Sequence, residues 1–330
     1  MLYSIQTLRA IAAWIVVAHH YVQAHGFSQK TPYFAFLSNY GAIGVDIFFI
    51  ISGFVVYNSA RKNTVSPLNF AIHRAARIIP IYWLCTFITA LLFIFLPKFI
   101  PSIEVDSLFF IRSLLFIPSP HPSGFGIYPL VTVGWTLNFE VIFYLILFFA
   151  LFFGKNRLIF TVFIGIFILN SILAKYISVF QYYSSSLIYE FCMGILIAAF
   201  YEKKEYKNAN LVTSIILLSI GIYLLYRAGG VSHDPIKNGI PCSLIFISAI
   251  SQERYFSNFK CSNHLGNWSY STYLFHPLII PICIKFTNKF SFDEKITIIL
   301  IVVLILVVSY LSFRYIEKPI SENIKAKFQH

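Results

Sequence analysis

Charged residues are scarce in this sequence, and acidic ones are the scarcest. Only 12% of the 330 residues are charged, whereas a soluble domain carries about 25%. Hydrophobic residues make up 58% of the chain, which is more apolar surface than a soluble core of this length can bury. These proportions exclude an ordinary cytosolic enzyme and a disordered chain, and they indicate an all-α, polytopic integral membrane protein.

Paired cysteines are also missing. No C-x-x-C pair occurs, and the five cysteines are widely spaced, at Cys85, Cys192, Cys242, Cys261 and Cys283. Most of them fall inside apolar segments, where a buried thiol without a disulfide partner is a common arrangement. The spacing excludes a secreted disulfide scaffold and argues against a metal or redox site.

Long apolar runs are abundant. A membrane-spanning helix needs about 20 predominantly apolar residues. We expect ten such helices, at residues 8–24, 40–58, 79–97, 131–153, 158–174, 186–201, 210–227, 238–252, 265–284 and 296–313. A shorter run at 107–118 precedes three prolines and is expected to be re-entrant or interfacial. The longest stretch between helices is 98–130, so we predict one transmembrane domain over 1–330 and no separate soluble domain.

The basic residues gather in short segments between the apolar runs. They give the chain a formal net charge of +12. This distribution is typical of membrane topology and of contact with anionic lipids, and we expect no nucleic-acid partner. When both termini are placed in the cytoplasm, the cytoplasmic segments hold more lysines and arginines than the outer ones, which agrees with the positive-inside rule. We therefore predict about ten transmembrane helices with both termini cytoplasmic.

Six histidine and acidic residues fall inside the expected helices. Such residues are costly in a membrane and are candidates for a functional site, although a structural hydrogen bond explains any single one more simply. With the predicted orientation, and about 1.5 Å of rise per residue, four of them lie in the outer half of the bilayer. These four are His20, Asp46, Glu140 and His276, while His19 points elsewhere and Glu190 either joins them or faces water. The shared depth favours one site.

Arginines lie toward the cytoplasmic side of the membrane in the predicted orientation. Arg9 lies eleven residues before His20, so a helix brings both to one face, roughly 16 Å apart. Arg74 and Arg77 are expected in the cytoplasmic segment before the third helix. With Arg9 they form a cationic cluster whose guanidinium groups suit phosphate. A topology signal with lipid headgroup contact explains the arginines equally well.

The helix at 131–153 adds polar side chains to this picture. Trp135, Asn138 and Tyr144, together with His276, are candidate substrate-binding residues. Contact with the membrane interface is the alternative for the tryptophan and the tyrosine. A histidine can take a proton from a hydroxyl when a carboxylate fixes its tautomer. Phosphate-binding groups inside and a histidine with carboxylates nearer the outside indicate acyl transfer to a sugar or lipid hydroxyl.

Six segments carry a family pattern in order along nearly the whole chain. They are LRAIAAWIVVAHH (8–20), GVDIFFIISGF (44–54), HRAARIIPIYW (73–83), WTLNFEVIFYL (135–145), SYSTYLFHPL (269–278) and RYIEKPI (314–320). In these segments the chain resembles the membrane-bound acyltransferase-3 family, bacterial enzymes that O-acylate polysaccharides, lipopolysaccharide and related glycans. The WTLNFE segment is most similar to the exopolysaccharide-acylating branch.

The resemblance implies roles for individual residues. It implies that His20 is the catalytic histidine and that acyl-CoA, with acetyl-CoA the default, is the co-substrate, with no permanently bound cofactor. We interpret as catalytic His20, Asp46 and Glu140, and as donor-binding Arg9, Arg74 and Arg77. Glu317 matches the acid of the family's C-terminal motif.

The expected partners follow from the same resemblance. They are a glycan or lipid-linked saccharide acceptor and membrane lipids, in a bacterial inner membrane, with homo-oligomerisation left open. Many relatives carry a second, soluble domain, so we expect this chain to act alone or with a partner. Acceptor specificity is expected in the outer loops 25–39, 98–130 and 228–237.

Three other functions fit parts of the pattern. A transporter or flippase also places charges near the midplane and uses helices interrupted by proline. A haem protein would use His20 and His276 as axial ligands. A structural scaffold leaves the matched depths unexplained. If the protein is an acyltransferase, its residues are consistent both with direct transfer and with a covalent acyl-histidine intermediate.

Overall fold

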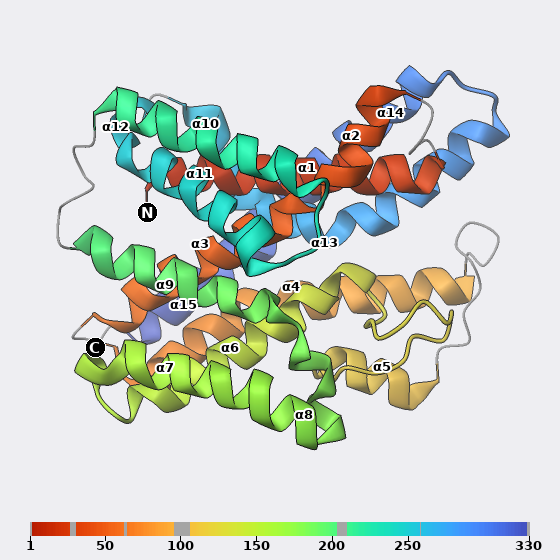
Figure 1. Ribbon diagram of the computed structural model, residues 1–330. Helices are drawn as coiled ribbons and strands as arrows, with labels where there is room; N and C mark the ends of the chain where they lie inside the picture. Colours follow the sequence, from red (N-terminus) through yellow and green to blue (C-terminus); the bar gives the residue numbers. More distant parts are fainter. Residues whose placement is uncertain are drawn as a thin grey trace. The chain divides into compact units, whose positions relative to one another are not determined.

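The computed structural model describes residues 2–26, 31–62, 65–95, 106–202, 210–257 and 259–328. Within these ranges every regular element is helical (Figure 1), and a single isolated bridge joins Pro120 to Ile127. The expectation of an all-helical chain is confirmed.

The first part of the chain forms α1 (Tyr3–His25), α2 (Pro32–Tyr40), α3 (Ile43–Ala60), α4 (Pro67–Phe95), α5 (Ser107–Leu114), α6 (Trp135–Leu151), α7 (Leu158–Phe167) and α8 (Ala174–Tyr176). The rest forms α9 (Tyr189–Glu202), α10 (Leu211–Ala228), α11 (Ile240–Ser251), α12 (Glu253–Phe256), α13 (Lys260–Lys289), α14 (Glu294–Ser312) and α15 (Lys318–Phe328). Short 3-10 segments are η1 (Thr132–Gly134), η2 (Lys155–Arg157), η4 (Ser178–Ser184) and η5 (Ser186–Ile188), and π segments are η3 (Ile168–Leu173), η6 (Pro235–Gly239) and η7 (Phe313–Glu317).

Each of the ten predicted ranges coincides with a helix. Six helices of the described chain are long and apolar enough to cross a membrane, or seven if the bent pair Ser178–Ser184 and Ser186–Tyr201 forms one span. The chain is therefore a multi-pass membrane protein by its helices, while the count of ten and the location of the termini stay predictions. The segment at 107–118 contains the short helix α5.

Helix α4 begins twelve residues before the predicted start at residue 79. Pro67 occupies its first position, and Ser66 accepts a hydrogen bond from the backbone N–H of Asn69 at 3.2 Å. This is a normal helix start, because proline lacks the N–H that the first turn leaves without a partner. The apolar count missed these turns because they are polar. The sequence had suggested that Arg74 and Arg77 lie in a segment before the third helix. In the structure both lie within α4.

The helices group into two compact units that alternate along the chain. The first unit comprises Met1–His19, Ser28–Ala71 and Ile142–Asn267. The second comprises His20–Phe27, Ile72–Val141 and Trp268–His330. Helices α1, α4, α6 and α13 contribute residues to both units.

In the first unit, α3 and α9 pack through small residues. Gly53 lies against the backbone carbonyl of Phe191, and Gly194 lies against that of Ile50. A Cβ at either glycine would overlap the opposing backbone, so the helices approach as closely as small-residue seams allow in membranes. The ring of Phe191 stacks on that of Phe49, with centroids 4.5 Å apart.

Helices α10 and α11 form the other pair of the first unit and run side by side in Figure 1. Gly221 of α10 faces Ile245 of α11, and the Ser248 hydroxyl donates to the Ser214 carbonyl at 2.7 Å. Only 11% of the apolar stretch of α10 is buried. Most of this helix therefore presents apolar side chains to whatever surrounds the protein.

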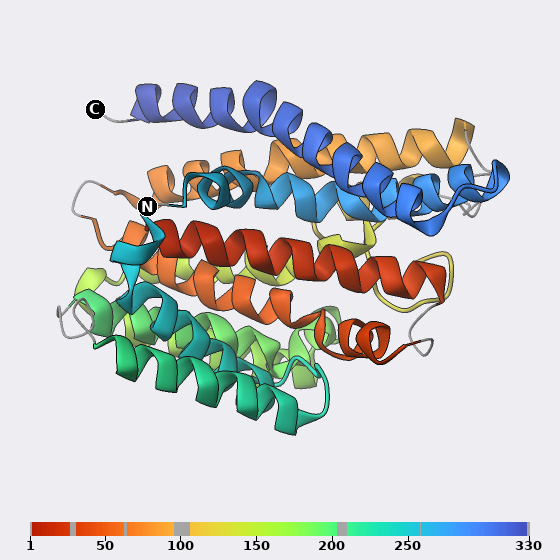
Figure 2. The same cartoon turned by 90° about the horizontal axis from the view of Figure 1, so that it is seen from above.

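In the second unit, hydroxyl groups join α13 to α14. Thr272 pairs with Ser309 at 2.9 Å, and Thr287 accepts from Thr297 at 2.9 Å. Interhelical hydroxyl bonds of this kind hold helices together in a membrane, where apolar contact alone gives little preference. Helix α14 continues through η7 into α15 as one long rod (Figure 2).

Candidate active site

Two histidines meet in the second unit. Nε2 of His276, on α13, lies 2.9 Å from Nδ1 of His20, on α1, and the ring centroids are 4.9 Å apart. His276 is completely buried. Its other nitrogen, Nδ1, lies 3.2 Å from the backbone carbonyl of Thr272. The second unit thus holds a chain of contacts from a fixed carbonyl to the predicted catalytic histidine.

This chain sets the tautomers of a neutral pair. A carbonyl oxygen only accepts, so Nδ1 of His276 carries the proton and donates to Thr272. Nε2 of His276 then has a lone pair and accepts from Nδ1–H of His20. Neutral His20 consequently keeps its lone pair on Nε2. A neutral imidazole with a defined basic nitrogen is what a general base requires.

The surroundings of His276 are built by α6 and the segment before it. The Tyr273 ring lies 5.9 Å from the His276 ring, and its hydroxyl donates to the Val133 carbonyl at 3.1 Å. Thr136, at the start of α6, pairs with the same hydroxyl at 3.0 Å. These contacts fix the position of Tyr273 and so limit the movement of the His276 ring.

Three of the predicted site residues lie on the same stretch of α6, in the second unit. Trp135 is half-buried and packs edge-on against Phe139, with ring centroids 6.1 Å apart. Asn138 is buried, and its Oδ1 has no hydrogen-bond partner among the described residues. Glu140 is half-buried, and its charge acts on the buried Tyr270. The buried oxygen of Asn138 can accept a hydrogen bond from a substrate hydroxyl.

The arginines of α4 are also in the second unit. Arg74 and Arg77 are half-buried and one turn apart. Directly after them, the carbonyl of Ile78 accepts a hydrogen bond from the Tyr270 hydroxyl of α13 at 2.8 Å. This bond ties the α4 segment that carries the arginines to the helix that carries His276.

Arg9 lies in the first unit, on the same α1 helix as His20. It is buried, and its Nη1 is 3.5 Å from Oε1 of Gln6. Nε2 of Gln6 donates to Oδ1 of Asn267 at 2.6 Å. Because α1 is continuous from Tyr3 to His25, the predicted spacing of Arg9 and His20 on one helix is confirmed. Tyr144 also belongs to the first unit, where its hydroxyl is 3.4 Å from that of Ser52.

Asp46 forms a hydrogen bond with a different histidine, His233. Its Oδ2 lies 2.9 Å from Nδ1 of His233, while Asp46 itself is completely buried in α3. The sequence interpretation gave Asp46 or Glu140 the role of orienting His20. In the structure Asp46 pairs with His233, and Nδ1–H of His20 donates to a histidine, His276.

A second carboxyl group faces Asp46. Glu190 of α9 is completely buried, and Asp46 and Asp234 both act on it electrostatically. Neither of its oxygens has a hydrogen-bond partner that meets normal geometry among the described residues. Buried carboxyl groups next to each other are costly unless a cation or a proton compensates them. The first unit thus contains an acid cluster of Asp46, Glu190 and Asp234, with His233 at its edge.

The loop that carries His233 is tightly organised. Oδ1 of Asn238 accepts from the backbone N–H of Ser232 at 3.0 Å, and Oδ1 of Asp234 accepts from the N–H groups of Ile236 and Lys237, both at 2.9 Å. His233 has a φ of 54°, in the left-handed region that few non-glycine residues occupy. Such strain persists only where the surroundings enforce it, and it gathers at functional sites.

Sequence reasoning underestimated two of these residues. His233 falls in the outer loop 228–237, which was expected only to carry acceptor specificity, and Glu190 was left between the site and the interface. The signal available was the Ser-His-Asp-Pro run at 232–235, which places two ionisable groups before a helix start. Nothing local indicates that this loop contacts Asp46, 187 residues earlier.

The geometry of the histidine pair argues against the haem alternative. The two imidazoles are hydrogen-bonded directly, so neither iron nor a porphyrin fits between their facing nitrogens. Among the described residues, no group of three or more His, Cys, Asp or Glu side chains is arranged to hold a metal ion.

Apolar helices around buried titratable groups define a multi-pass membrane protein with polar sites in its interior. A family model described as an acyltransferase domain matches residues 2–314. The chain belongs to the acyltransferase-3 family, as the resemblance in its six segments indicated.

Several characterised proteins are similar to the chain. It is 28% identical over 294 residues to the exopolysaccharide production protein ExoZ of Rhizobium meliloti, covering 87% of this chain and 92% of ExoZ. It is 25% identical to the peptidoglycan O-acetyltransferase OatA of Listeria monocytogenes, covering 97% of this chain and 56% of that protein. The O-acetyltransferase OatA of Staphylococcus aureus is 27% identical, with 86% of this chain and 53% of OatA covered. The chain thus spans about half the length of the two OatA proteins. No solved structure matches it.

Proposed function

We propose that this protein transfers an acyl group, with acetyl the expected one, from cytoplasmic acyl-CoA to a hydroxyl of a cell-surface or lipid-linked glycan. The family membership and the O-acetyltransferase activity of its relatives support an O-acyltransferase. The observation that carries the residue assignment is the 2.9 Å contact between His20 and His276, which leaves the basic lone pair on Nε2 of His20. We place the enzyme in a bacterial inner membrane.

The proposed reaction has one bond forming and one breaking. Nε2 of His20 accepts the proton of the acceptor hydroxyl as the oxygen attacks the thioester carbonyl. The carbon–sulfur bond then breaks, and the imidazolium returns the proton to the CoA thiolate. His276 and Thr272 hold His20 in the tautomer that this step needs. A covalent acyl-histidine, formed by attack of Nε2 itself, uses the same nitrogen.

The donor is assigned to the arginines. Arg74 and Arg77 stand one turn apart on α4, where two guanidinium groups can bind phosphate oxygens. Arg9, on α1, adds a third positive charge on the helix that carries His20. We assign to Asn138 and Trp135 contacts with the acceptor, because both lie on α6 in the unit that holds the histidine pair.

The test uses the intact protein in its own membrane. Surface glycans of a gene-deletion strain are compared by mass spectrometry with those of the strain complemented with wild type or with His20→Ala. We expect an acyl mass to be missing in the deletion and in His20→Ala, since a general base contributes about 10²–10⁴-fold in rate. The mass and its position identify the acyl group and the acceptor. Normal acylation by His20→Ala at equal protein level contradicts the proposal.

A transporter or flippase is the second candidate. It is favoured by Pro277 and Pro281, which lie inside α13 after His276, because transporters also carry prolines within their helices, although α13 itself is continuous. Purified protein in liposomes separates the two. An acyltransferase makes acylated glycan from labelled acetyl-CoA, whereas a transporter only moves the glycan across the bilayer.

A further inference from the structure

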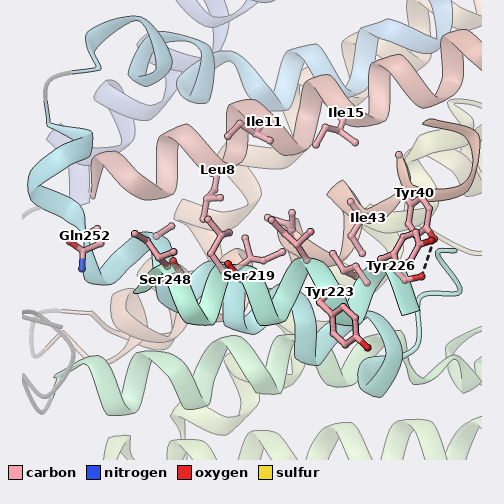
Figure 3. A pocket seen from close by; sticks show the side chains of 18 of the residues that line it. Leu8, Ile11, Ile15, Tyr40, Ile43, Ser219, Tyr223, Tyr226, Ser248 and Gln252 are labelled. Atoms are coloured by element: carbon pink, nitrogen blue, oxygen red, sulfur yellow. Dashed lines mark hydrogen bonds between the residues drawn. The ribbon is translucent and has the colours of Figure 1, made fainter. Parts of the chain in front are cut away.

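A long apolar groove runs through the first unit. It lies between α1, α2 and α3 on one side and α10 and α11 on the other, and it encloses about 1140 Å³ (Figure 3). Ligand pockets for small molecules measure about 300–1,000 Å³, so this groove suits a longer molecule. Its walls are mainly aliphatic and aromatic, with Leu8, Ile11 and Ile15 of α1 facing Ile215, Leu218 and Ile222 of α10.

The groove exists because α10 packs mainly on α11. Only 11% of its apolar stretch is buried, and the side chains at positions 215, 218, 222 and 226 follow each other at helical spacing along the groove. On α10 the lining runs from Leu211 to Tyr226, a length of roughly 22 Å at 1.5 Å per residue. That length suits an extended hydrocarbon chain that crosses most of one bilayer.

Both ends of the groove carry a tyrosine beside an arginine. At one end the Tyr40 hydroxyl donates to the Tyr226 carbonyl at 3.2 Å, and the exposed Arg227 follows in the chain (Figure 3). At the other end lie Gln252, Ser248 and Tyr255, and the Arg254 guanidinium is 4.8 Å from the Tyr255 ring centroid. Tyrosines beside an arginine are typical of the level of lipid headgroups, where the arginine can bind a phosphate. With the predicted orientation, the tyrosine end at Tyr40 and Tyr226 faces the outside of the cell.

The tyrosine end adjoins the acid cluster. The backbone N–H of Val231 donates to the carbonyl of Asn39 at 3.0 Å, which joins α2 to the loop that carries His233. Two wall residues also touch α1 next to the predicted catalytic position, because Nδ1 of His19 lies 3.1 Å from the Leu37 carbonyl and Gly41 packs against the His19 side chain. The loop that carries His233 therefore contacts α2 next to this end of the groove.

We propose that this groove holds the hydrocarbon chain of a lipid-linked saccharide acceptor. The lipid phosphate binds at Arg227, and the saccharide extends over the loop of His233. The inference rests on the proposed function, whose acceptor it narrows to a glycan that is still attached to a membrane lipid. A bulk phospholipid or the helix of a second copy are the other occupants that such a surface allows.

Photolabelling tests the proposal without requiring acyl transfer. The full chain in phosphatidylcholine nanodiscs is exposed to hexadecyl phosphate that carries a diazirine at the far end of its chain. In wild type, we expect the labelled peptides to come from the groove walls of α1, α10 and α11. Ile215→Trp and Ile222→Trp fill the groove and should reduce labelling roughly tenfold by blocking apolar contact area.

Matched controls lie on the same helix. Ile216 and Ile220 are exposed to a similar degree as Ile215 and Ile222 but face away from the groove, so Ile216→Trp and Ile220→Trp should label as wild type does. Arg227→Gln should weaken labelling by hexadecyl phosphate and leave labelling by the corresponding hexadecanol probe unchanged. His20→Ala should label normally, which separates this proposal from the proposed catalytic function.

Three results overturn the proposal. One is equal labelling in the groove variants and their controls, which indicates bulk lipid at this surface. Another is wild-type labelling spread over all apolar helices. The third is a cross-link between two copies of the chain at the groove residues, which assigns the surface to a dimer.

Discussion

His276 holds Nδ1 of His20 at 2.9 Å, and Thr272 in turn holds His276. The basic nitrogen of His20 is thus fixed by a second imidazole. A histidine in the role of an orienting group adds no permanent charge, whereas a carboxylate at the same place would add a buried anion that needs compensation.

The first prediction concerns this orienting contact. His276→Ala allows both tautomers of His20, and we expect kcat to fall by about 10²-fold or more while KM for the donor stays within about twofold, as for other bases held in the wrong tautomer. His276→Gln keeps an acceptor oxygen for Nδ1–H of His20 and should recover part of the rate. The measurement is acetyl transfer by the purified protein in liposomes.

A histidine elsewhere on the same helix provides the control. His264 is exposed near the start of α13, and His264→Ala should leave kcat unchanged. If His276→Ala loses activity only in parallel with folded protein, as judged by its thermal unfolding, the positioning role is refuted.

The second prediction concerns the donor site. Arg74→Ala and Arg77→Ala should each weaken CoA binding about tenfold or more, since a charge-assisted hydrogen bond contributes roughly 1.5–3 kcal/mol. Arg74→Lys should bind less tightly than wild type, because an ammonium group cannot make a bidentate contact with phosphate. Calorimetric titration with CoA measures these affinities. Arg157→Ala, at an exposed position of η2, is the matched control.

The third prediction concerns the hydrogen bond between Asp46 and His233. Asp46→Ala and His233→Ala should each destabilise the protein by about 1–3 kcal/mol, because each leaves the partner without its hydrogen bond. The double variant should cost less than the sum of the two, with a coupling energy of about 0.5–3 kcal/mol. Denaturant unfolding in detergent measures all four proteins. Strict additivity would show that the two side chains do not interact.

The fourth prediction concerns pH and the loop before η1. Burial lowers the pKa of His121 below the ordinary value of 6.5. Below that ordinary value the unfolded loop binds a proton more readily than the folded one, so acid favours the unfolded form. The stability contributed by neutral His121 is fully present above about pH 6.5 and is lost as the pH falls.

The thermal unfolding of wild type and His121→Gln at pH 7.5 and pH 5.5 tests this. Wild type should lose more stability between the two pH values than the glutamine variant, which has no group that titrates there. An equal loss in both proteins would assign the pH dependence to other groups.

The sequence predicts the helices well because apolar runs of sufficient length have few other outcomes in a membrane. It also places Arg9 and His20 on one helix, since their spacing follows from the helical repeat alone. The predicted start of α4 at residue 79 was wrong, because the first turns of the helix are polar and the prediction relied on apolar residues. Local features such as Pro67 and Ser66 carry that boundary instead.

The periodicity of the sequence could not predict which residues far apart along the chain come into contact. His20 meets His276, 256 residues later, and Asp46 meets His233, 187 residues later. A shared depth in the membrane narrowed the candidates but did not separate the two units. Which histidine belongs with which carboxyl group depends on how helices pack, and that is decided by side-chain shape at seams such as the one around Gly53 and Phe191.

The π turn η7, between α14 and α15, makes the contacts of Glu317 depend on the number of residues in this segment. In a regular α-helix, residues five apart point about 140° away from each other, yet Ser312 and Glu317 both reach the Ser271 hydroxyl, at 2.7 and 2.5 Å. The wider turn of η7 brings them to the same side. Removing one residue from this segment would restore regular winding and swing Glu317 away from α13. The number of residues in this segment therefore matters as much as their identity. A deletion that removes none of the named side chains would still break the contact between Glu317 and Ser271.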